Sequence, residues 1–221
     1  MPIPNTAYGI EIARFCNGLL FTGGGDIDPK YYGEEPDGFD KTTLEPERDR
    51  IEHEIISLPE FSKKPVLGIC RGMQSLAAFQ GGRLIQDIPA YQERARARRR
   101  ANHRQDGPRG SFSHAVRVKE RSLLEATMGV GFRMVNSMHH QAVREPPAGW
   151  RISALSEDGL IEGMEAPGKT FRVAVQWHPE ELFRHSDVDR KLFEALVNSS
   201  ASLNAGLPQI RPEGRIMRAG T

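Results

Sequence analysis

The sequence predicts an α/β fold: an open, mostly parallel sheet flanked by helices and extended by a β-rich edge. Strand-like and helix-like segments alternate early in the chain, whereas short strands follow one another later. A length of 221 residues suits one substantial core and is short for two domains. We therefore expect one domain over residues 1–200 and a flexible tail over residues 201–221.

The first half of the chain contains two predicted strands, each running into a turn. Residues 18–22 form an apolar strand that ends in the glycine-rich turn "TGGGD". Residues 45–58 have apolar residues at helical spacing and Pro46 in the first turn, which predicts an amphipathic helix. The run "PVLGIC" at 65–70 is typical of a strand buried on both faces. A helix follows from residue 71 and is stopped by Gly81-Gly82.

The second half is predicted to be strand-rich. The patterns predict a closing helix at 187–200 and strands at 114–119, 132–137, 151–156, 160–166 and 171–177. Before them, residues 92–110 carry a cluster of arginines. No aromatic residue alternates with these arginines, so a solvated, mobile loop is favoured over a nucleic-acid-binding arm.

Composition narrows the function class. The formal net charge is +1, so no global field draws the chain to nucleic acid or to a membrane surface. Two cysteines are too few for a disulfide framework and fit a reduced compartment. No apolar run approaches the roughly 18 residues of a membrane span, and the first residues do not resemble a signal peptide. We expect a cytoplasmic protein with neither nucleic-acid nor membrane partners.

A cysteine stands where the second strand meets its helix. Cys70 ends an apolar run and a helix begins near Arg71, which is the geometry of a nucleophile elbow. Such a turn lifts the side chain above the carboxyl edge of the sheet, where ligands bind, and the helix amino terminus stabilises a thiolate. The alternative is a small buried core residue, because free cysteine is among the most buried residue types. The position of Cys70 alone does not decide between a nucleophile and a buried core residue.

Two further features fit a nucleophilic thiol. His178 and Glu180 follow another apolar strand, and on an extended chain residues two apart point the same way, so Glu180 can orient the imidazole that takes the Cys70 proton. The glycine turn "FTGGGD" has backbone N–H groups that can face a developing oxyanion. Taken singly, each has an ordinary reading: a hydrogen-bonded histidine at a strand end, and a tight turn without a ligand.

Together these residues resemble the class I glutamine amidotransferase-like family, and more narrowly its gamma-glutamyl-gamma-aminobutyrate hydrolase branch. The matching stretches follow the family's order over most of residues 18–182: "LLFTGGGDIDPKYYGEE", "ERDRIEHEII", "PVLGICRGMQSL", "GGRLIQDI", "VNSMHHQAV", "IEGMEA" and "VQWHPE". The resemblance implies a flavodoxin-like sheet and a hydrolase of linear gamma-glutamyl amides, with a role in polyamine catabolism.

The resemblance also implies roles for individual residues. A catalytic triad falls on Cys70, His178 and Glu180, and the oxyanion hole falls on the backbone N–H groups of Gly24 and Arg71. The substrate-binding residues implied by the family pattern are Gln74, Asn136, Ser137, His139, His140 and Gln141. The implied reaction forms a glutamyl thioester and needs no cofactor. A metal on the His139-His140 pair is disfavoured, because adjacent residues on a strand face opposite sides.

Two features depart from the family pattern. After "CRGMQ" the chain has "SLAAF", where the family has a small residue and then asparagine, which affects packing behind the thiol. The chain also opens at Met1-Pro2, without the strand and helix that family members place first. We expect that strand to be an inner one, so that its absence lowers stability or leads to pairing with a second copy.

Three functions remain open from the sequence. The first is a hydrolase acting alone on a small gamma-glutamyl amide. The second is a glutaminase subunit that delivers ammonia to a separate synthase partner. The third is an inactive binding module that has lost activity with its first strand. A homo-oligomer is compatible with all three, and fold analogy alone does not choose among them.

Overall fold

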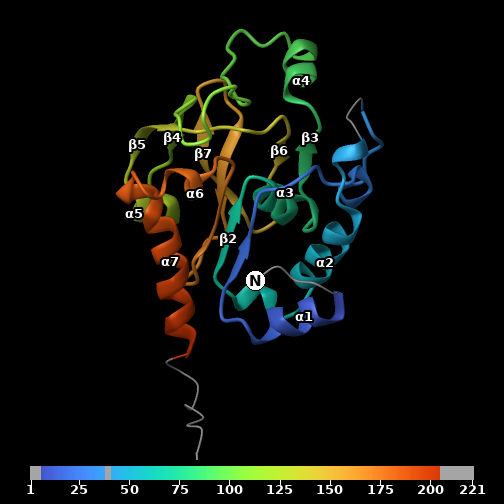
Figure 1. The fold of residues 1–221 in the computed structure, drawn as a ribbon, viewed down its shortest axis with the longest axis vertical. Helices are drawn as coiled ribbons and strands as arrows, with labels where there is room; N and C mark the ends of the chain where they lie inside the picture. Colours follow the sequence, from blue (N-terminus) through green and yellow to red (C-terminus); the bar gives the residue numbers. More distant parts are fainter. Residues whose placement is uncertain (1–5, 38–40, 205–221) are drawn as a thin grey trace, which may run out of the picture.

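The computed structural model describes residues 6–37 and 41–204. In this part of the chain one nine-stranded sheet has helices on both faces (Figure 1). The strands are β1 (Leu19–Phe21), β2 (Val66–Ile69), β3 (Arg83–Ile85), β4 (His114–Val118), β5 (Gly131–Val135), β6 (Ala142–Glu145), β7 (Arg151–Ser156), β8 (Ile161–Glu165) and β9 (Arg172–Val175). The α-helices are α1 (Thr6–Phe15), α2 (Pro46–Ile56), α3 (Arg71–Ala78), α4 (Ile88–Arg94), α5 (Leu123–Met128), α6 (Pro179–Leu182) and α7 (Asp187–Asn204), and the 3₁₀ helices are η1 (Pro29–Tyr32), η2 (Lys41–Thr43) and η3 (Phe61–Lys63).

The sheet has a parallel part and an antiparallel part. Its main path runs β1-β2-β9-β8-β7-β4-β5, and β6 pairs with both β3 and β8. Parallel pairing joins β1 to β2 and β2 to β9, with Ile69 opposite Val175, whereas the other pairs described are antiparallel. The open α/β sheet with a β-rich edge is thus confirmed, and the antiparallel part contains more strands than the parallel part.

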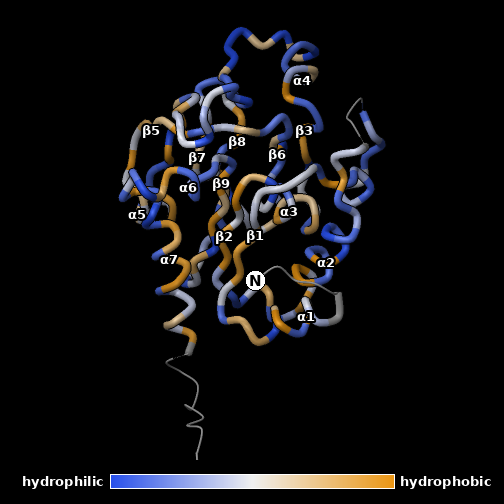
Figure 2. Tube along the Cα trace, in the orientation of Figure 1, coloured by the Kyte–Doolittle hydropathy of each residue, from blue (hydrophilic) through white to orange (hydrophobic). Residues whose placement is uncertain are grey.

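Two cores lie on opposite faces of the sheet. Successive residues of a strand point to opposite faces, so Val66 joins the core under α2 and α3 while Leu67 joins the core under α5 and α7. Both side chains are fully buried. Figure 2 shows hydrophobic residues along β1 and β2 at the centre and hydrophilic residues over the loop that follows α4. The central strands therefore form a rigid support for whatever their carboxyl ends carry.

Most predicted elements are present, and several short ones were missed. The five strands predicted in the second half correspond to β4, β5, β7, β8 and β9. The elements not predicted from the sequence are α1, β3, α4, α5, β6 and α6. The closing helix extends to Asn204, so residues 201–204 are helical rather than part of a tail, and the rest of the predicted tail lies outside the described residues.

The prediction of a solvated loop at residues 92–110 is wrong in part. Gln92 lies in α4 and is buried, and His103 is also buried. The physical reason is Asp158, whose carboxylate accepts hydrogen bonds from Gln92 Nε2 at 2.7 Å and from the Ala101 backbone N–H at 2.9 Å, and lies 3.0 Å from His103 Nε2. The charged residues around Gln92, Ala101 and His103 gave no sign of these hydrogen bonds.

Within the described ranges, every helix is too short or too polar to span a bilayer.

Candidate active site

Cys70 occupies a sharp turn between β2 and α3. Its backbone has φ 51° and ψ −109°, a left-handed conformation that is uncommon outside glycine. The Cys70 N–H still bonds to the Val175 carbonyl at 2.9 Å, so the sheet ladder extends to the turn itself. Gly72 makes the turn possible, because a Cβ there would lie 2.1 Å from the Phe21 carbonyl oxygen. The predicted elbow is present, and it holds the thiol at the carboxyl edge of the parallel strands.

His178 and Glu180 follow the neighbouring strand. Glu180 Oε1 lies 2.6 Å from His178 Nδ1. The two residues do not lie on an extended chain as expected, because α6 begins at Pro179 and Glu180 stands in its first turn. Burial lowers the pKa of His178, but hydrogen bonds and charge interactions with Cys70 and Glu180 outweigh burial and raise this pKa to about 10. The imidazole is therefore placed to hold a proton between the Cys70 sulfur and the Glu180 carboxylate.

The glycine turn forms the wall of a pocket above these side chains. A Cβ on Gly23 would lie 2.8 Å from His178 Cε1 and 3.8 Å from the Cβ of Cys70, so the turn backbone lies directly against the reactive groups. The pocket has a volume of about 520 Å³. Its lining is formed by Leu20, Thr22, Gly23, Gly24, Ile69, Cys70, Arg109, Met138, His178, Glu180 and Phe193. Four of the predicted site residues, Gly24, Cys70, His178 and Glu180, thus meet at one cavity.

An ion network that was not predicted from the sequence ties the glycine turn to α2 and α3. Arg48 of α2 donates to the backbone carbonyls of Thr22 at 2.7 Å and Gly23 at 3.0 Å. The Arg71 side chain points away from the pocket and donates to Asp49 at 2.6 Å and Glu52 at 2.5 Å. The backbone N–H of Arg71 remains at the amino end of α3, where the helix has no internal acceptor for it. The spacing of Arg48 and Glu52 at i and i+4 was the available signal in the sequence.

The six predicted substrate-binding side chains are not among the residues that line this pocket. Most of them make internal hydrogen bonds. Gln74 donates to the Gln141 carbonyl at 3.2 Å, Gln141 donates to the Gln86 carbonyl at 3.1 Å, and Ser137 Oγ donates to the His103 carbonyl at 2.6 Å. The neighbour that does line the pocket is Met138. Of the segment 136–141, Met138 is therefore the residue that reaches the pocket lining.

Asn136 and His140 connect this segment to the reactive groups. Asn136 accepts from the His178 backbone N–H and donates to the His178 carbonyl, both at 3.0 Å, which clamps the backbone of the base. His140 Nε2 lies 3.0 Å from Asp26 Oδ1 in the glycine turn, and the hydrogen bond with Asp26 raises the pKa of His140 above its ordinary value. His139 faces the other way, toward Glu162. The two rings thus have different partners.

The arrangement has the parts of an acyl-transfer site. A thiol on a strained turn lies beside an imidazole that a carboxylate orients, which is the arrangement of an activated nucleophile. The glycine turn borders this cavity, and α3 begins directly after Cys70, so backbone N–H groups of both can stabilise an oxyanion. Arg109, from the segment after α4, supplies a cation to the lining and lies 2.7 Å from Glu181 through its Nε. The cavity can therefore take a small carbonyl compound with an anionic end.

Comparisons with known proteins found one matching family and several relatives. The profile of the Peptidase C26 family matches residues 2–180. A glutamine amidotransferase-like protein of Lactococcus lactis is 35% identical over 205 residues, covering 90% of this chain and 81% of that protein. The gamma-glutamyl-gamma-aminobutyrate hydrolase of Escherichia coli K12 is 31% identical over 180 residues, covering 79% of this chain and 67% of that protein.

A solved structure shares the fold. A GMP synthase component from Thermoplasma acidophilum superposes with a TM-score of 0.61 at 18% identity, over 90% of this chain and 80% of that one. At this identity the agreement concerns the fold alone.

Proposed function

The chain belongs to the Peptidase C26 family of glutamine amidotransferase-like hydrolases, and from this membership we propose that it cleaves gamma-glutamyl amides of the gamma-glutamyl-gamma-aminobutyrate type to glutamate and an amine. One observation carries the proposal. Cys70 sits on a left-handed turn at the end of β2, next to a strand whose end carries His178, and Glu180 lies 2.6 Å from that imidazole. Fold maintenance alone gives no reason for this combination.

The proposed reaction proceeds through a covalent thioester. The Cys70 thiolate attacks the gamma-carbonyl carbon, and the protonated His178 gives its proton to the departing amine as the C–N bond breaks. Neutral His178 then takes a proton from a water molecule, whose oxygen attacks the thioester and releases glutamate and the thiolate. Glu180 stabilises the imidazolium in each step. We assign the developing oxyanion to the backbone N–H groups of Gly24 and Arg71.

The predicted substrate-binding residues take two roles in this proposal. Asn136 positions the base through its two hydrogen bonds to the His178 backbone. Gln74, Ser137, His139, His140 and Gln141 support the segment 136–141, on which the glutamyl group rests. The direct contacts to the leaving group are assigned instead to Met138 and Arg109, which line the cavity. Arg109 offers a cation to the carboxylate of gamma-aminobutyrate.

The first experiment is glutamate release by the purified chain acting alone. Gamma-glutamyl-gamma-aminobutyrate and glutamine are compared as substrates for the wild type, for Cys70→Ala and for Cys16→Ala, the matched cysteine control. We expect faster release from the conjugate, a loss of at least about 1000-fold in Cys70→Ala and unchanged rates in Cys16→Ala. A folded wild-type chain that releases glutamate from neither compound contradicts a hydrolase that acts alone.

A second candidate is a glutaminase that passes ammonia to a separate synthase. The observation that favours it is the fold shared with a component of a GMP synthase. Such a glutaminase is expected to be nearly idle when purified alone, and to prefer glutamine once a synthase partner is present. The first experiment therefore separates the two candidates. An inactive binding module predicts no release under either condition.

Arg109 gives a test of the leaving group. Replacing Arg109 with serine removes the cation from the pocket lining, so we expect the KM for gamma-glutamyl-gamma-aminobutyrate to rise by about tenfold while the KM for glutamine changes little. Arg98→Ser, in the same basic segment but outside the lining, is the matched control. Equal effects of Arg109→Ser on both substrates contradict a carboxylate-binding role. The measurement is steady-state kinetics on both compounds.

A further inference from the structure

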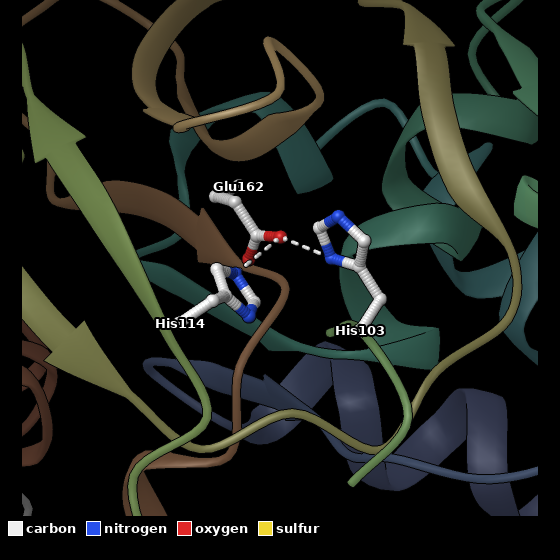
Figure 3. Close-up of side chains that lie close together, drawn as sticks. All are labelled: His103, His114 and Glu162. Atoms are coloured by element: carbon white, nitrogen blue, oxygen red, sulfur yellow. Dashed lines mark hydrogen bonds and ion pairs between the residues drawn. The ribbon is translucent and has the colours of Figure 1, made fainter. Parts of the chain in front are cut away.

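A cluster of buried histidines surrounds one carboxylate on the antiparallel side of the sheet. His114 comes from β4, Glu162 from β8 and His103 from the segment that follows α4 (Figure 3). Their side chains are at most 4% exposed. One ligand atom from each residue lies within 4.8 Å of those of the other two. The proposed hydrolysis uses none of these three residues.

The distances within the cluster converge on a single oxygen. Glu162 Oε1 lies 3.1 Å from His103 Nδ1, 3.1 Å from His114 Nε2 and 3.6 Å from His139 Nε2. His139 Nε2 and the second oxygen of Glu162 are buried and have no hydrogen-bond partner among the described residues. Figure 3 shows the His103 and His114 rings turned toward the carboxylate. Three imidazole nitrogens therefore face one carboxylate oxygen.

In each ring, the hydrogen-bond partner of the outer nitrogen, which faces away from Glu162, determines whether the inner nitrogen carries a hydrogen. His114 Nδ1 lies 3.2 Å from the Asn102 carbonyl and His139 Nδ1 lies 2.7 Å from the Gln141 carbonyl. A carbonyl only accepts, so each of these rings holds its hydrogen on the outer nitrogen. His103 Nε2 faces the Asp158 carboxylate at 3.0 Å in the same manner. In the neutral rings the inner nitrogens then present lone pairs to a negatively charged oxygen, which is repulsive unless a cation lies between them.

The spacing suits a metal ion. Bonds of about 2.0–2.2 Å in a tetrahedral zinc site place neighbouring ligand atoms about 3.4 Å apart, and the three separations from Glu162 Oε1 lie on either side of this value. A divalent cation balances the two carboxylates Glu162 and Asp158 with all three rings neutral. Outer hydrogen bonds from ligand histidines to a carboxylate or a carbonyl are the usual surroundings of a bound metal.

We propose that His103 Nδ1, His114 Nε2 and Glu162 Oε1 bind a divalent ion of the zinc class, with His139 Nε2 at the fourth position. Nitrogen ligands with one carboxylate oxygen in a closed tetrahedral set favour zinc over magnesium or calcium. The site is buried, so the ion is structural rather than catalytic. This site differs from the expectation of no metal, which rested on the adjacent pair His139 and His140.

The ion would tie three separate segments to the active-site wall. Arg109 and Met138 are the two lining residues assigned to the leaving group. His103 belongs to the segment that leads to Arg109, and His139 directly follows Met138. The Ser137 side chain already bonds to the His103 carbonyl at 2.6 Å. Metal binding would fix this contact, and with it the distance between the segments that carry Arg109 and Met138.

The competing occupant is a proton on His103. Burial lowers the pKa of His103, but hydrogen bonds and charge interactions with Asp158 and Glu162 outweigh it and raise the pKa to about 9. In the absence of metal this proton would let His103 donate hydrogen bonds to both Asp158 and Glu162. Metal binding would displace it, so the experiment has to detect the ion itself.

The test measures metal in the full-length chain without an affinity tag. Metal content is determined by plasma mass spectrometry after purification, and chelator-treated protein is then titrated with Zn²⁺ and with Co²⁺, whose visible absorption reports tetrahedral nitrogen and oxygen ligands. Titrations use the Cys70→Ala background so that the thiol cannot take the ion. We expect one ion per chain and a rise in the unfolding temperature with Zn²⁺.

Variants locate the site. Glu162→Gln is expected to abolish binding, and Asp158→Asn to weaken it about 10- to 100-fold by loosening the His103 ring. His185→Asn, an exposed histidine outside the cluster, should leave affinity unchanged. If Glu162→Gln does not fold, the test rests on the metal affinity of Asp158→Asn and on the Co²⁺ spectrum of the parent chain. The proposal is overturned if the parent chain binds no ion, or if Asp158→Asn binds with unchanged affinity.

Discussion

Gly23 lies where any side chain would displace the imidazole of His178. A Cβ at this position would be 2.8 Å from His178 Cε1, so Gly23→Ala should move the ring by a few tenths of an ångström or more. A misplacement on the order of 1 Å costs about 100-fold in rate, and we expect a loss in kcat/KM of about that size. The measurement is steady-state hydrolysis together with thermal unfolding.

The control for Gly23→Ala is Gly107→Ala. Gly107 lies in open space, with no atom within 4 Å of an added Cβ and without a positive φ. Its replacement should leave both activity and unfolding temperature unchanged. A Gly23→Ala variant as active as Gly107→Ala would show that the turn does not constrain the base.

The His178 proton links stability to pH. The pKa of His178 is raised from 6.5 to about 10: burial lowers it, but contacts with Cys70 and Glu180 more than compensate. A group with a raised folded-state pKa stabilises the fold fully below its unfolded pKa, and this contribution is lost as pH rises through the folded pKa. We expect the free energy of unfolding to fall between about pH 6.5 and pH 10, and to fall less in His178→Gln.

The difference between the two unfolding curves isolates His178. The pKa of His103 is also raised, by Asp158 and Glu162 against the effect of burial, but this contribution is common to both chains and cancels. Parallel curves for wild type and His178→Gln across this range would contradict the assigned ion pair. Denaturant titrations at each pH provide the free energies.

At the scale of elements, one carboxylate joins α2 to α3. Glu52 accepts from Arg71 at 2.5 Å, from Ser75 at 2.6 Å and from Arg48 at 2.7 Å. Glu52→Gln takes a carboxylate partner from both arginines and leaves Asp49 to face Arg71, so it should lower the free energy of unfolding by about 3 kcal/mol. Chemical denaturation measures this change.

Glu54→Gln is the control on the same helix. Glu54 pairs with Arg50 at 3.3 Å, and both side chains are substantially exposed, so its loss should cost less than about 1 kcal/mol. Similar losses in the two variants would mean that the network under the turn contributes no more than a surface pair.

The elements also explain which parts of the fold could be predicted. β2 and β9 were predictable because burial on both faces requires an apolar run, and Cys70 and His178 follow those runs. β3 has only three residues, and half of β6 is exposed, so neither carries a local pattern. Their existence depends on pairing with distant strands. Glu162 was hidden for a related reason, since a carboxylate within a strand is recognisable as part of a cluster only once its histidine partners are in place.

At the scale of the whole molecule, stability should decline from the centre of the sheet to its edge. Val66, Leu67 and Val173 in the central strands are fully buried, whereas Phe132 and Met134 in the end strand β5 are 73% and 49% exposed. Backbone amides in β2 and β9 should therefore exchange with solvent only through global unfolding, and those of β5 should be at least about 100-fold less protected. Native-state hydrogen exchange with peptide-level mass spectrometry tests this. Uniform protection from β9 to β5 would contradict it.

The adjacency of β2 and β9 has a consequence for the growing chain. β9 inserts between β2, which is made early, and β8, which immediately precedes it. During synthesis the thiol of Cys70 therefore emerges long before its base, and the pair forms only when β9, the last strand of the described residues, has entered the sheet. A nascent or truncated chain would carry an inert cysteine, so that hydrolytic competence arrives together with the completed sheet.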